Sequence, residues 1–266
     1  MSDETITTGD RGLTVILLIA GTVIGKRSLL WEVIVLKPDF ILFDCMETLV
    51  DVVEKPELRT YSRWCYDGCG YESLWSSFDN FVEDYRQTRD SMRAKEEKNR
   101  ELNCLHIYRV MIGRKTSSQQ HADQAANQVL QNYWRNYMKN CYVDDGVKST
   151  LKELSSKYPL GVVSNFMVDG GIEELLKVHD LHSYFSFVVT SVRSGWKKPH
   201  PGIYDDAITM SKVPVDKTLF IGDDYECDYI GPRQYGFHSI LLDKQNRYPE
   251  VPERIASIPD LLKILD

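Results

Sequence analysis

The chain places a carboxylate, Asp44, directly after the apolar run Phe40–Phe43. If that run is a buried strand, the carboxylate faces a crevice, because open α/β sheets bind ligands just outside the carboxyl ends of their strands. A carboxylate in such a place can attack phosphorus and form an aspartyl-phosphate. Taken alone, however, Asp44 is explained as well by capping of the turn that follows it.

Two more polar signals follow later apolar runs. Ser164-Asn165 offers a hydroxyl and an amide that could hold two phosphoryl oxygens, although the same dipeptide suits an ordinary turn. Lys197-Lys198 could neutralise charge on the nucleophile and on the transferring group, or be ordinary loop charge. Together with Asp44, these residues favour a carboxylate nucleophile that works on an anion.

An acidic segment, Asp223–Asp228, contains four acids in six residues. Such groups repel one another when they are buried without a cation, and Mg²⁺ favours a few carboxylates with waters and substrate oxygens. The alternative is the solvated first turn of a helix, where acidic residues favour the helix dipole. That alternative fits Asp224 and Glu226 better than Asp223, which directly follows an apolar strand and a glycine.

The segments that must position these groups alternate between strand and helix patterns. Short apolar runs predict buried strands over 39–44, 160–164, 185–190, 219–222 and 239–242. Helical spacing predicts helices over 147–158 and 171–178, from Pro201 onward, and over 261–265 at the end of the chain. Strands that alternate with helices predict an α/β fold with a Rossmann-like, doubly wound parallel sheet.

Residues 53–142 break this alternation, since they contain no convincing strand. Helices are expected over 61–66, 74–92, 97–112 and 119–140, with aromatic residues at a helical spacing that is more typical of a core than of a ligand site. We therefore predict an all-helical insertion at 53–142, which divides an α/β core made of residues 37–52 and 143–266.

Composition excludes several classes of protein. The chain has 266 residues, a net charge of −7 and no basic stripe, which argues against a nucleic-acid partner. Its six cysteines form no spaced framework, so reduced thiols and a cytoplasmic location are expected. No nucleophile elbow and no paired-histidine zinc spacing competes with the acidic set.

The first 36 residues are expected to be an extra segment outside the core. Their apolar run Leu13–Ile24 is too short to span a bilayer and is preceded by acidic residues, so neither a membrane anchor nor a signal peptide is predicted. The segment Gly21–Arg27 has too few residues between its glycines for a phosphate-binding loop.

The order of these segments resembles that of the haloacid dehalogenase-like (HAD) hydrolase superfamily. The resemblance rests on the segments Phe43–Leu49, Val163–Asn165, Lys198–Tyr204 and Gly222–Gly231, and it covers the chain from about Pro38 onward. It implies a HAD core with a helical cap inserted after the first core strand.

The resemblance also implies roles for individual residues. Asp44 would be the nucleophile, and Lys198 a catalytic and substrate-binding cation. Substrate binding would further involve Thr48, Ser164 and Asn165. Mg²⁺ would be held by Asp44, the backbone carbonyl of Met46, Asp223 and Asp228.

The chain departs from the family at Met46, where HAD phosphatases usually carry a second Asp that protonates the leaving group. A thioether cannot transfer a proton, and general acid–base help is worth about 10²–10⁴ in rate. Glu47 is adjacent, but on an extended segment a shift of one residue turns the side chain away, so we expect Glu47 to point elsewhere.

Three functions remain open. The first, which we favour, is a Mg²⁺-dependent phosphatase of small phosphorylated metabolites, acting through an aspartyl-phosphate on Asp44. The second is a metal-independent 2-haloacid dehalogenase with a halogenated substrate, in which halide leaves without a proton. The third is a catalytically weakened HAD domain that binds a phosphorylated ligand or a protein. The sequence does not reveal the oligomeric state.

Overall fold

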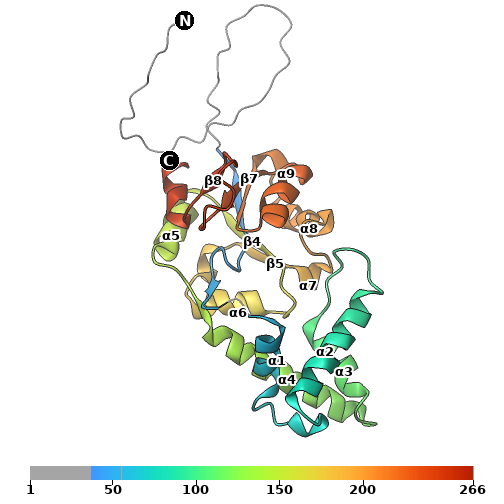
Figure 1. The fold of residues 1–266 in the computed structure, drawn as a ribbon. Coiled ribbons are helices and arrows are strands. Elements are labelled where there is room, and N and C mark those ends of the chain that lie inside the picture. The colour runs from blue at the N-terminus through green and yellow to red at the C-terminus, as the bar shows by residue number, and fades with distance from the viewer. Residues whose placement is uncertain (1–36, 55, 266) are drawn as a thin grey trace, which may run out of the picture.

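A computed structural model describes residues 37–54 and 56–265. The expectations for the first 36 residues lie outside this range. The described chain has two regions (Figure 1): an α/β region built on a central sheet, and a region of helices α1 to α4 connected to it.

Within the described residues, the central sheet has six parallel strands in the order β5-β4-β1-β6-β7-β8. The strands are β1 (Phe40–Phe43), β4 (Leu160–Ser164), β5 (Phe187–Thr190), β6 (Thr218–Gly222), β7 (His238–Leu242) and β8 (Arg254–Ile255). Each predicted strand run matches one of β1, β4, β5, β6 and β7 to within two residues at either end, while the two-residue β8 was not predicted. The α/β fold with a parallel, doubly wound sheet is confirmed.

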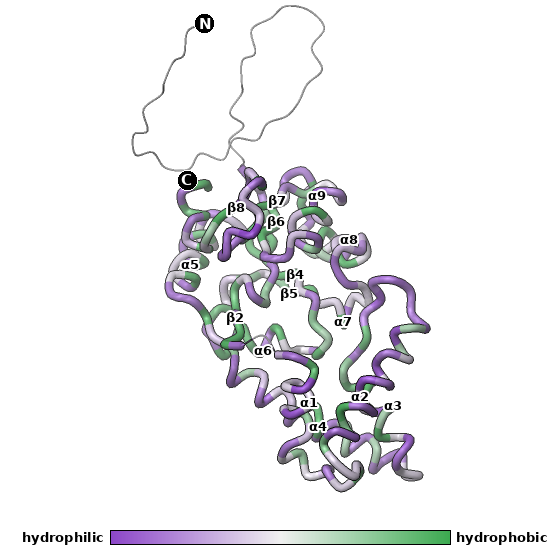
Figure 2. The backbone as a smooth tube through the Cα atoms, viewed as in Figure 1, coloured by the Kyte–Doolittle hydropathy of each residue, from purple (hydrophilic) through white to green (hydrophobic). Residues whose placement is uncertain are grey.

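Strand β1 lies inside the sheet, and all four of its residues are buried. Its side chains alternate between two cores, with Ile41 and Phe43 in one and Phe40 and Leu42 in the other. This alternation follows from the two-residue period of a strand. A strand covered on both faces must be apolar throughout, which explains why β1 is a continuous hydrophobic run. Hydrophobic stretches coincide with the strands of the sheet in Figure 2.

Different helices supply the two cores. Helices α5 (Val147–Lys157) and α6 (Gly171–Val178) contribute apolar side chains to the core that contains Ile41. Helix α8 (Pro201–Ser211) packs against the other face and is followed by α9 (Gly231–Tyr235). Short helical turns lie between these elements, at η2 (His182–Tyr184), α7 (Ser191–Ser194) and η3 (Val215–Lys217), and the 3₁₀-helix η5 (Ile258–Lys263) follows β8. Helices on both faces leave the carboxyl edge of the sheet as the open side.

The helical region is inserted between two short strands, β2 (Asp51–Val52) and β3 (Cys141–Tyr142), which pair as an antiparallel ladder. Between these strands run α1 (Leu58–Tyr66), η1 (Glu72–Leu74), α2 (Phe78–Arg93), α3 (Cys104–Gly113) and α4 (Gln119–Lys139). Aromatic residues hold these helices together, as the edge-to-face pair of Trp75 and Phe81 at 4.8 Å illustrates. The division into a core and a cap at the stated boundaries stays a prediction.

The helix expected over 97–112 begins only at Cys104. Its first turn is capped by the side chain of Asn103, which accepts a hydrogen bond from the amide of His106. The preceding residues form a loop that pairs with the α/β region: the amide of Glu101 donates to the carbonyl of Gly195 at 2.9 Å. The helical spacing of the sequence could not reveal this tertiary pairing.

No helix among residues 37–54 and 56–265 combines the length and the apolar character that a bilayer crossing requires.

Candidate active site

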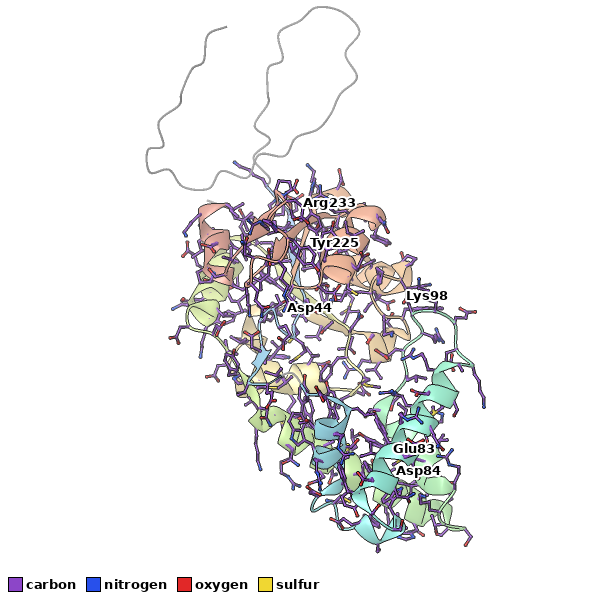
Figure 3. All side chains as sticks on the ribbon, viewed as in Figure 1. Asp44, Glu83, Asp84, Lys98, Tyr225 and Arg233 are labelled. Carbon is purple, nitrogen blue, oxygen red and sulfur yellow. The ribbon has the colours of Figure 1, made fainter. Side chains whose placement is uncertain are left out.

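Polar side chains from distant segments meet at the carboxyl edge of the sheet. Asp44 follows β1, Ser164 ends β4 and Asp223 follows β6, while Lys198 comes from the loop before α8. They line a cavity of about 600 Å³ that residues of the helical region also line. Figure 3 places Asp44 between the sheet and the helices. The crevice expected from the parallel topology is therefore present.

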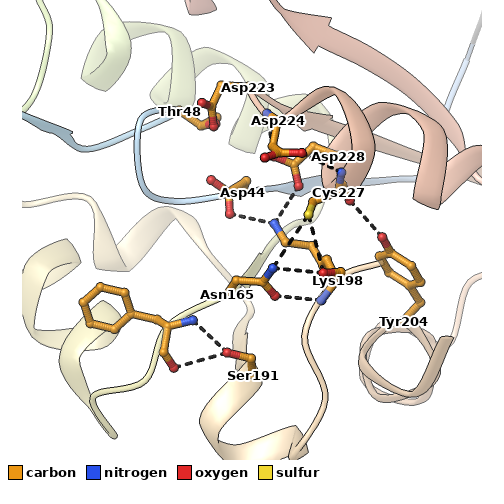
Figure 4. Close-up of polar contacts among 11 residues, drawn as sticks. Asp44, Thr48, Asn165, Ser191, Lys198, Tyr204, Asp223, Asp224, Cys227 and Asp228 are labelled. Carbon is orange, nitrogen blue, oxygen red and sulfur yellow. Dashed lines mark hydrogen bonds and ion pairs between the residues drawn. The ribbon is translucent and has the colours of Figure 1, made fainter. Parts of the chain in front are cut away.

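Lys198 lies at the centre of this site, and only 3% of its surface is exposed. Its ammonium is 2.7 Å from a carboxylate oxygen of Asp44 and 2.7 Å from one of Asp228 (Figure 4). Burial lowers the pKa of Lys198, but Asp228 and Asp44 outweigh that effect and raise it above its ordinary value. The lysine therefore stays charged, and it fixes the orientation of the carboxylate predicted to be the nucleophile.

Asp44, Asp223 and Asp228 form a carboxylate trio whose oxygens lie within 4.8 Å of one another. Burial, followed by the charge of Asp44, raises the pKa of Asp223 to about 7. Burial likewise raises the pKa of Asp228, although Lys198 opposes the shift. One ammonium does not balance three carboxylates, so the trio has the charge and the oxygen donors that suit a hard divalent cation such as Mg²⁺.

The solvated helix turn of the alternative fits Asp224 and Glu226, which are exposed at the start of a helix, but not the buried Asp228. The acidic segment forms a π-helix, η4 (Tyr225–Ile230), which returns Asp228 to the end of β6. Gly222 permits this close approach, since a Cβ there would lie 2.4 Å from a carboxylate oxygen of Asp228. Asp224 does act as a helix cap, because its carboxylate accepts from the amides of Glu226 and Cys227.

The side chain of Asn165 holds the backbone of Lys198. Its amide nitrogen donates to the Lys198 carbonyl at 3.1 Å, and its oxygen accepts from the Lys198 amide at 2.7 Å. Asn165 also lines the cavity, and its predicted substrate-binding role stays a prediction. What the structure adds is that this residue positions the lysine.

Ser164 lines the same cavity with a hydroxyl that has no hydrogen-bond partner among the described residues, although it is buried. An unpaired buried hydroxyl costs about 1–3 kcal/mol, so it calls for an unseen partner such as a bound anion. Thr48 is also buried, and its hydroxyl donates to a carboxylate oxygen of Asp223 at 3.3 Å. Met46 lines the cavity, while its carbonyl as a metal ligand stays a prediction.

The expectation that Glu47 points away from the site was wrong. The backbone at Glu47 is left-handed, with φ of 61°, and not extended. Glu47 consequently lines the cavity, and its charge adds to the effects that raise the pKa of Asp223 after burial and Asp44. An isolated sequence gives no sign of this turn, since left-handed backbone is uncommon for residues other than glycine.

Sequence reasoning missed several residues of the cavity. The helical region contributes Glu101, the arginines of α2 and a wall of tyrosines, comprising Tyr61, Tyr85, Tyr108, Tyr133 and Tyr137. Ser191, which does not line the cavity, was also missed, although it follows β5 as Asp44 follows β1, and the same polar signal after an apolar run would have found it. The residues of the helical region carried no comparable signal, because aromatic residues at helical spacing indicate packing first.

The arrangement combines a fixed carboxylate, a buried ammonium, a free hydroxyl and a cluster of acids around one cavity. With a divalent cation at the carboxylates, it could hold a tetrahedral anion next to Asp44. The Asp44 carboxylate could attack either phosphorus or carbon in this arrangement.

Parts of the chain are similar to known proteins. Haloacid dehalogenase-like hydrolase domain-containing protein 3 of Homo sapiens is 35% identical over 122 residues, which are 45% of this chain and 48% of that protein. Glyceraldehyde 3-phosphate phosphatase of Methanothermobacter thermautotrophicus is 32% identical over 98 residues, 36% of this chain and 43% of that protein. The chain thus matches about half the length of these relatives or less.

The fold has a similar solved structure in the 2-haloacid dehalogenase from Pseudomonas syringae pv. Tomato DC3000. It aligns with a TM-score of 0.70 at 20% identity and covers 86% of this chain and 98% of that one. The family model described as haloacid dehalogenase-like hydrolase matches residues 75–242, which include Ser164, Lys198, Asp223 and Asp228. The chain belongs to the haloacid dehalogenase-like hydrolase family.

Proposed function

We propose that this HAD-like hydrolase is a Mg²⁺-dependent phosphatase that acts on phosphate esters of small metabolites. The observation that carries the proposal is the carboxylate trio of Asp44, Asp223 and Asp228, of which Asp44 and Asp228 bind a single buried ammonium. A site for displacement of halide from carbon has no need of two further acids. The phosphatase names among the relatives support the same function.

In the proposed reaction, a carboxylate oxygen of Asp44 attacks phosphorus, and the bond between phosphorus and the ester oxygen breaks. Water then hydrolyses the aspartyl-phosphate and regenerates the carboxylate. Lys198 and the Ser164 hydroxyl bind the phosphoryl oxygens, and Asn165 keeps the lysine in place. Mg²⁺, held by the trio and the Met46 carbonyl, supplies charge neutralisation when it is bound.

The leaving alkoxide needs a proton that Met46 cannot give. The proposal therefore implies slow turnover of ordinary alkyl esters and faster turnover of esters whose leaving group is stable as an anion.

The wall from the helical region gives the substrate its chemical class. Arg89 of α2 lines the cavity, and its guanidinium contacts Asp90 at 2.9 Å. Asp90 also lies 3.4 Å from Arg86, but Arg86 is paired with Glu83 at 2.6 Å. Two carboxylates thus balance the two guanidiniums, and a substrate anion would have to replace Asp90 at Arg89. With the tyrosine rings beside it, we propose a phosphate ester whose body carries a second anionic group.

The first prediction concerns the nucleophile. Wild type should hydrolyse members of a phosphate-ester panel with Mg²⁺ and lose that activity with a chelator. Asp44→Asn should lower kcat at least about 10³-fold, because an amide does not attack phosphorus. The matched control is Asp224→Asn, which changes an acid of the segment 223–228 that caps a helix turn.

Turnover that survives Asp44→Asn would reject the aspartyl-phosphate route. Release of chloride from 2-chloropropionate that ignores the chelator would select the dehalogenase. An absence of turnover with retained Mg²⁺ binding would favour the non-catalytic domain.

The second prediction concerns pH and the metal. Because the pKa of Asp223 is raised in the folded protein, folding takes up protons between about pH 4 and 7, and the stability of the metal-free protein should fall as pH rises through that window. Mg²⁺ displaces those protons, so the increase in Tm on adding Mg²⁺ should be larger at pH 8 than at pH 6. Calorimetry at both pH values measures this, and Asp223→Asn should abolish most of the increase. Equal increases at both pH values would contradict it.

The third prediction concerns the missing acid. Met46→Asp should raise kcat for esters with poor leaving groups, by up to about 10²-fold, and change esters with good leaving groups much less. Met46→Asn is the matched control, since it has nearly the same shape and cannot transfer a proton. An equal effect of both variants would show that proton transfer does not limit the rate.

The fourth prediction concerns substrate class. Arg89→Gln should lower kcat/KM about 10-fold or more for esters that carry a carboxylate and leave matched neutral esters within about 2-fold. A suitable pair is 3-phosphoglycerate and glycerol 3-phosphate, extended by longer acids and alcohols of equal length. The control is Arg86→Gln, one turn earlier on the same helix and exposed. A uniform loss on both kinds of ester would remove Arg89 from specificity.

A further inference from the structure

The loop between α2 and α3 reaches the α/β region next to the segment that carries Lys198. In this contact, the amide of Glu101 donates to the Gly195 carbonyl at 2.9 Å, and the amide of Lys197 donates to the Asn99 carbonyl at 2.8 Å. Lys98, labelled in Figure 3, marks the loop at this level. The helical region is therefore hydrogen-bonded to the residue directly before the catalytic lysine.

Side chains reinforce the contact. The guanidinium of Arg100 lies over the ring of Trp196, 4.6 Å from its centroid. Gly195 makes room for this packing, because a Cβ there would lie 3.1 Å from the same guanidinium. The cation–π contact and the backbone pairing hold the two loops in one register.

The carboxylate of Glu101 is the deepest part of the contact, with 6% of its side chain exposed. One of its oxygens accepts from the hydroxyl of Ser191 at 2.5 Å, and the other lies 3.7 Å from the guanidinium of Arg93. The Ser191 oxygen in turn accepts from the amide of Phe166 at 2.8 Å. The carboxylate of Glu101, from the helical region, therefore forms a charge-assisted hydrogen bond with a residue of the α/β region, and such bonds are stronger than neutral ones.

Phe166 directly follows Asn165, whose side chain binds both backbone groups of Lys198. Hydrogen bonds thus link Glu101 to Ser191 and Ser191 to the backbone of Phe166, and the peptide bond from Phe166 to Asn165 continues the link to Lys198. Figure 4 draws Ser191, Asn165 and Lys198 of this connection. Lys198 must lie within hydrogen-bond distance of Asp44 and Asp228 at once, and a displacement of 1 Å in an active site can cost about 10²-fold in rate.

We propose that Glu101 is a positioning residue: its hydrogen bond to Ser191 makes the alignment of Lys198 depend on docking of the helical region. The inference rests on the proposed function for its kinetic consequence only. A substrate that fits the cavity while the loops are docked meets an aligned lysine, and one that keeps them apart meets a misaligned one. The contact thereby links substrate fit to catalysis.

The test compares Glu101→Ala, Ser191→Ala and the double variant with wild type. Each single variant should lower kcat about 10-fold or more, and Ser191→Ala should do so with little change in KM, since Ser191 is not among the residues that line the cavity. The two losses should not add in the double variant, because both remove the same hydrogen bond. Glu101→Gln should recover most of the rate, since its amide oxygen can still accept from Ser191. The control is Glu97→Ala, an exposed acid of the same loop.

Hydrogen exchange provides a readout that does not depend on activity. The amides of Phe166, Lys197 and Lys198 should exchange faster in Glu101→Ala than in wild type, while the sheet amides keep their protection. Unchanged exchange at these amides, or unchanged kcat in a folded Glu101→Ala, would overturn the inference. If wild type hydrolyses no ester, the phosphatase proposal fails, and the exchange rates alone decide whether Glu101 positions the lysine.

Discussion

The burial of Lys198 between Asp44 and Asp228 is the interaction on which the rest of the site depends. Removing one partner from a buried ion pair typically costs about 3–5 kcal/mol, because the remaining charge loses its compensation. Lys198 therefore holds the acids close together, and they hold it charged. The excess of carboxylates over ammonium then leaves the site short of positive charge, which a divalent cation can supply.

The sheet makes this cluster possible. Ser164, Asp44 and Asp223 lie at the ends of the adjacent parallel strands β4, β1 and β6, so they share one edge of the sheet without any strained connection. Gly222 and the π-helix that follows it bring Asp228 to the same edge. Apolar cores on both faces fix the strands, and the chemistry is left to the side that helices do not cover.

The helical region does more than cover the crevice. Its tyrosines and arginines form the far wall of the cavity, and its loop with Glu101 is bonded to the segment before Lys198. Under the proposed function, recognition of the substrate body and alignment of the lysine would both depend on this contact. The thioether of Met46 sets the limit on this site, since no tertiary contact can give it a transferable proton.

By itself, the sequence determined five strands of the parallel sheet and the position of Asp44, Ser164 and Asp223 at its open edge, because buried strands must be apolar and polar residues at their ends face that edge. Only the tertiary structure decided where Glu47 points and which residue of the helical region reaches the core. Glu101 and Ser191 are 90 positions apart, and the left-handed turn at Glu47 leaves no periodic pattern. Local patterns reflect burial within one element, whereas contacts between elements depend on how the elements pack.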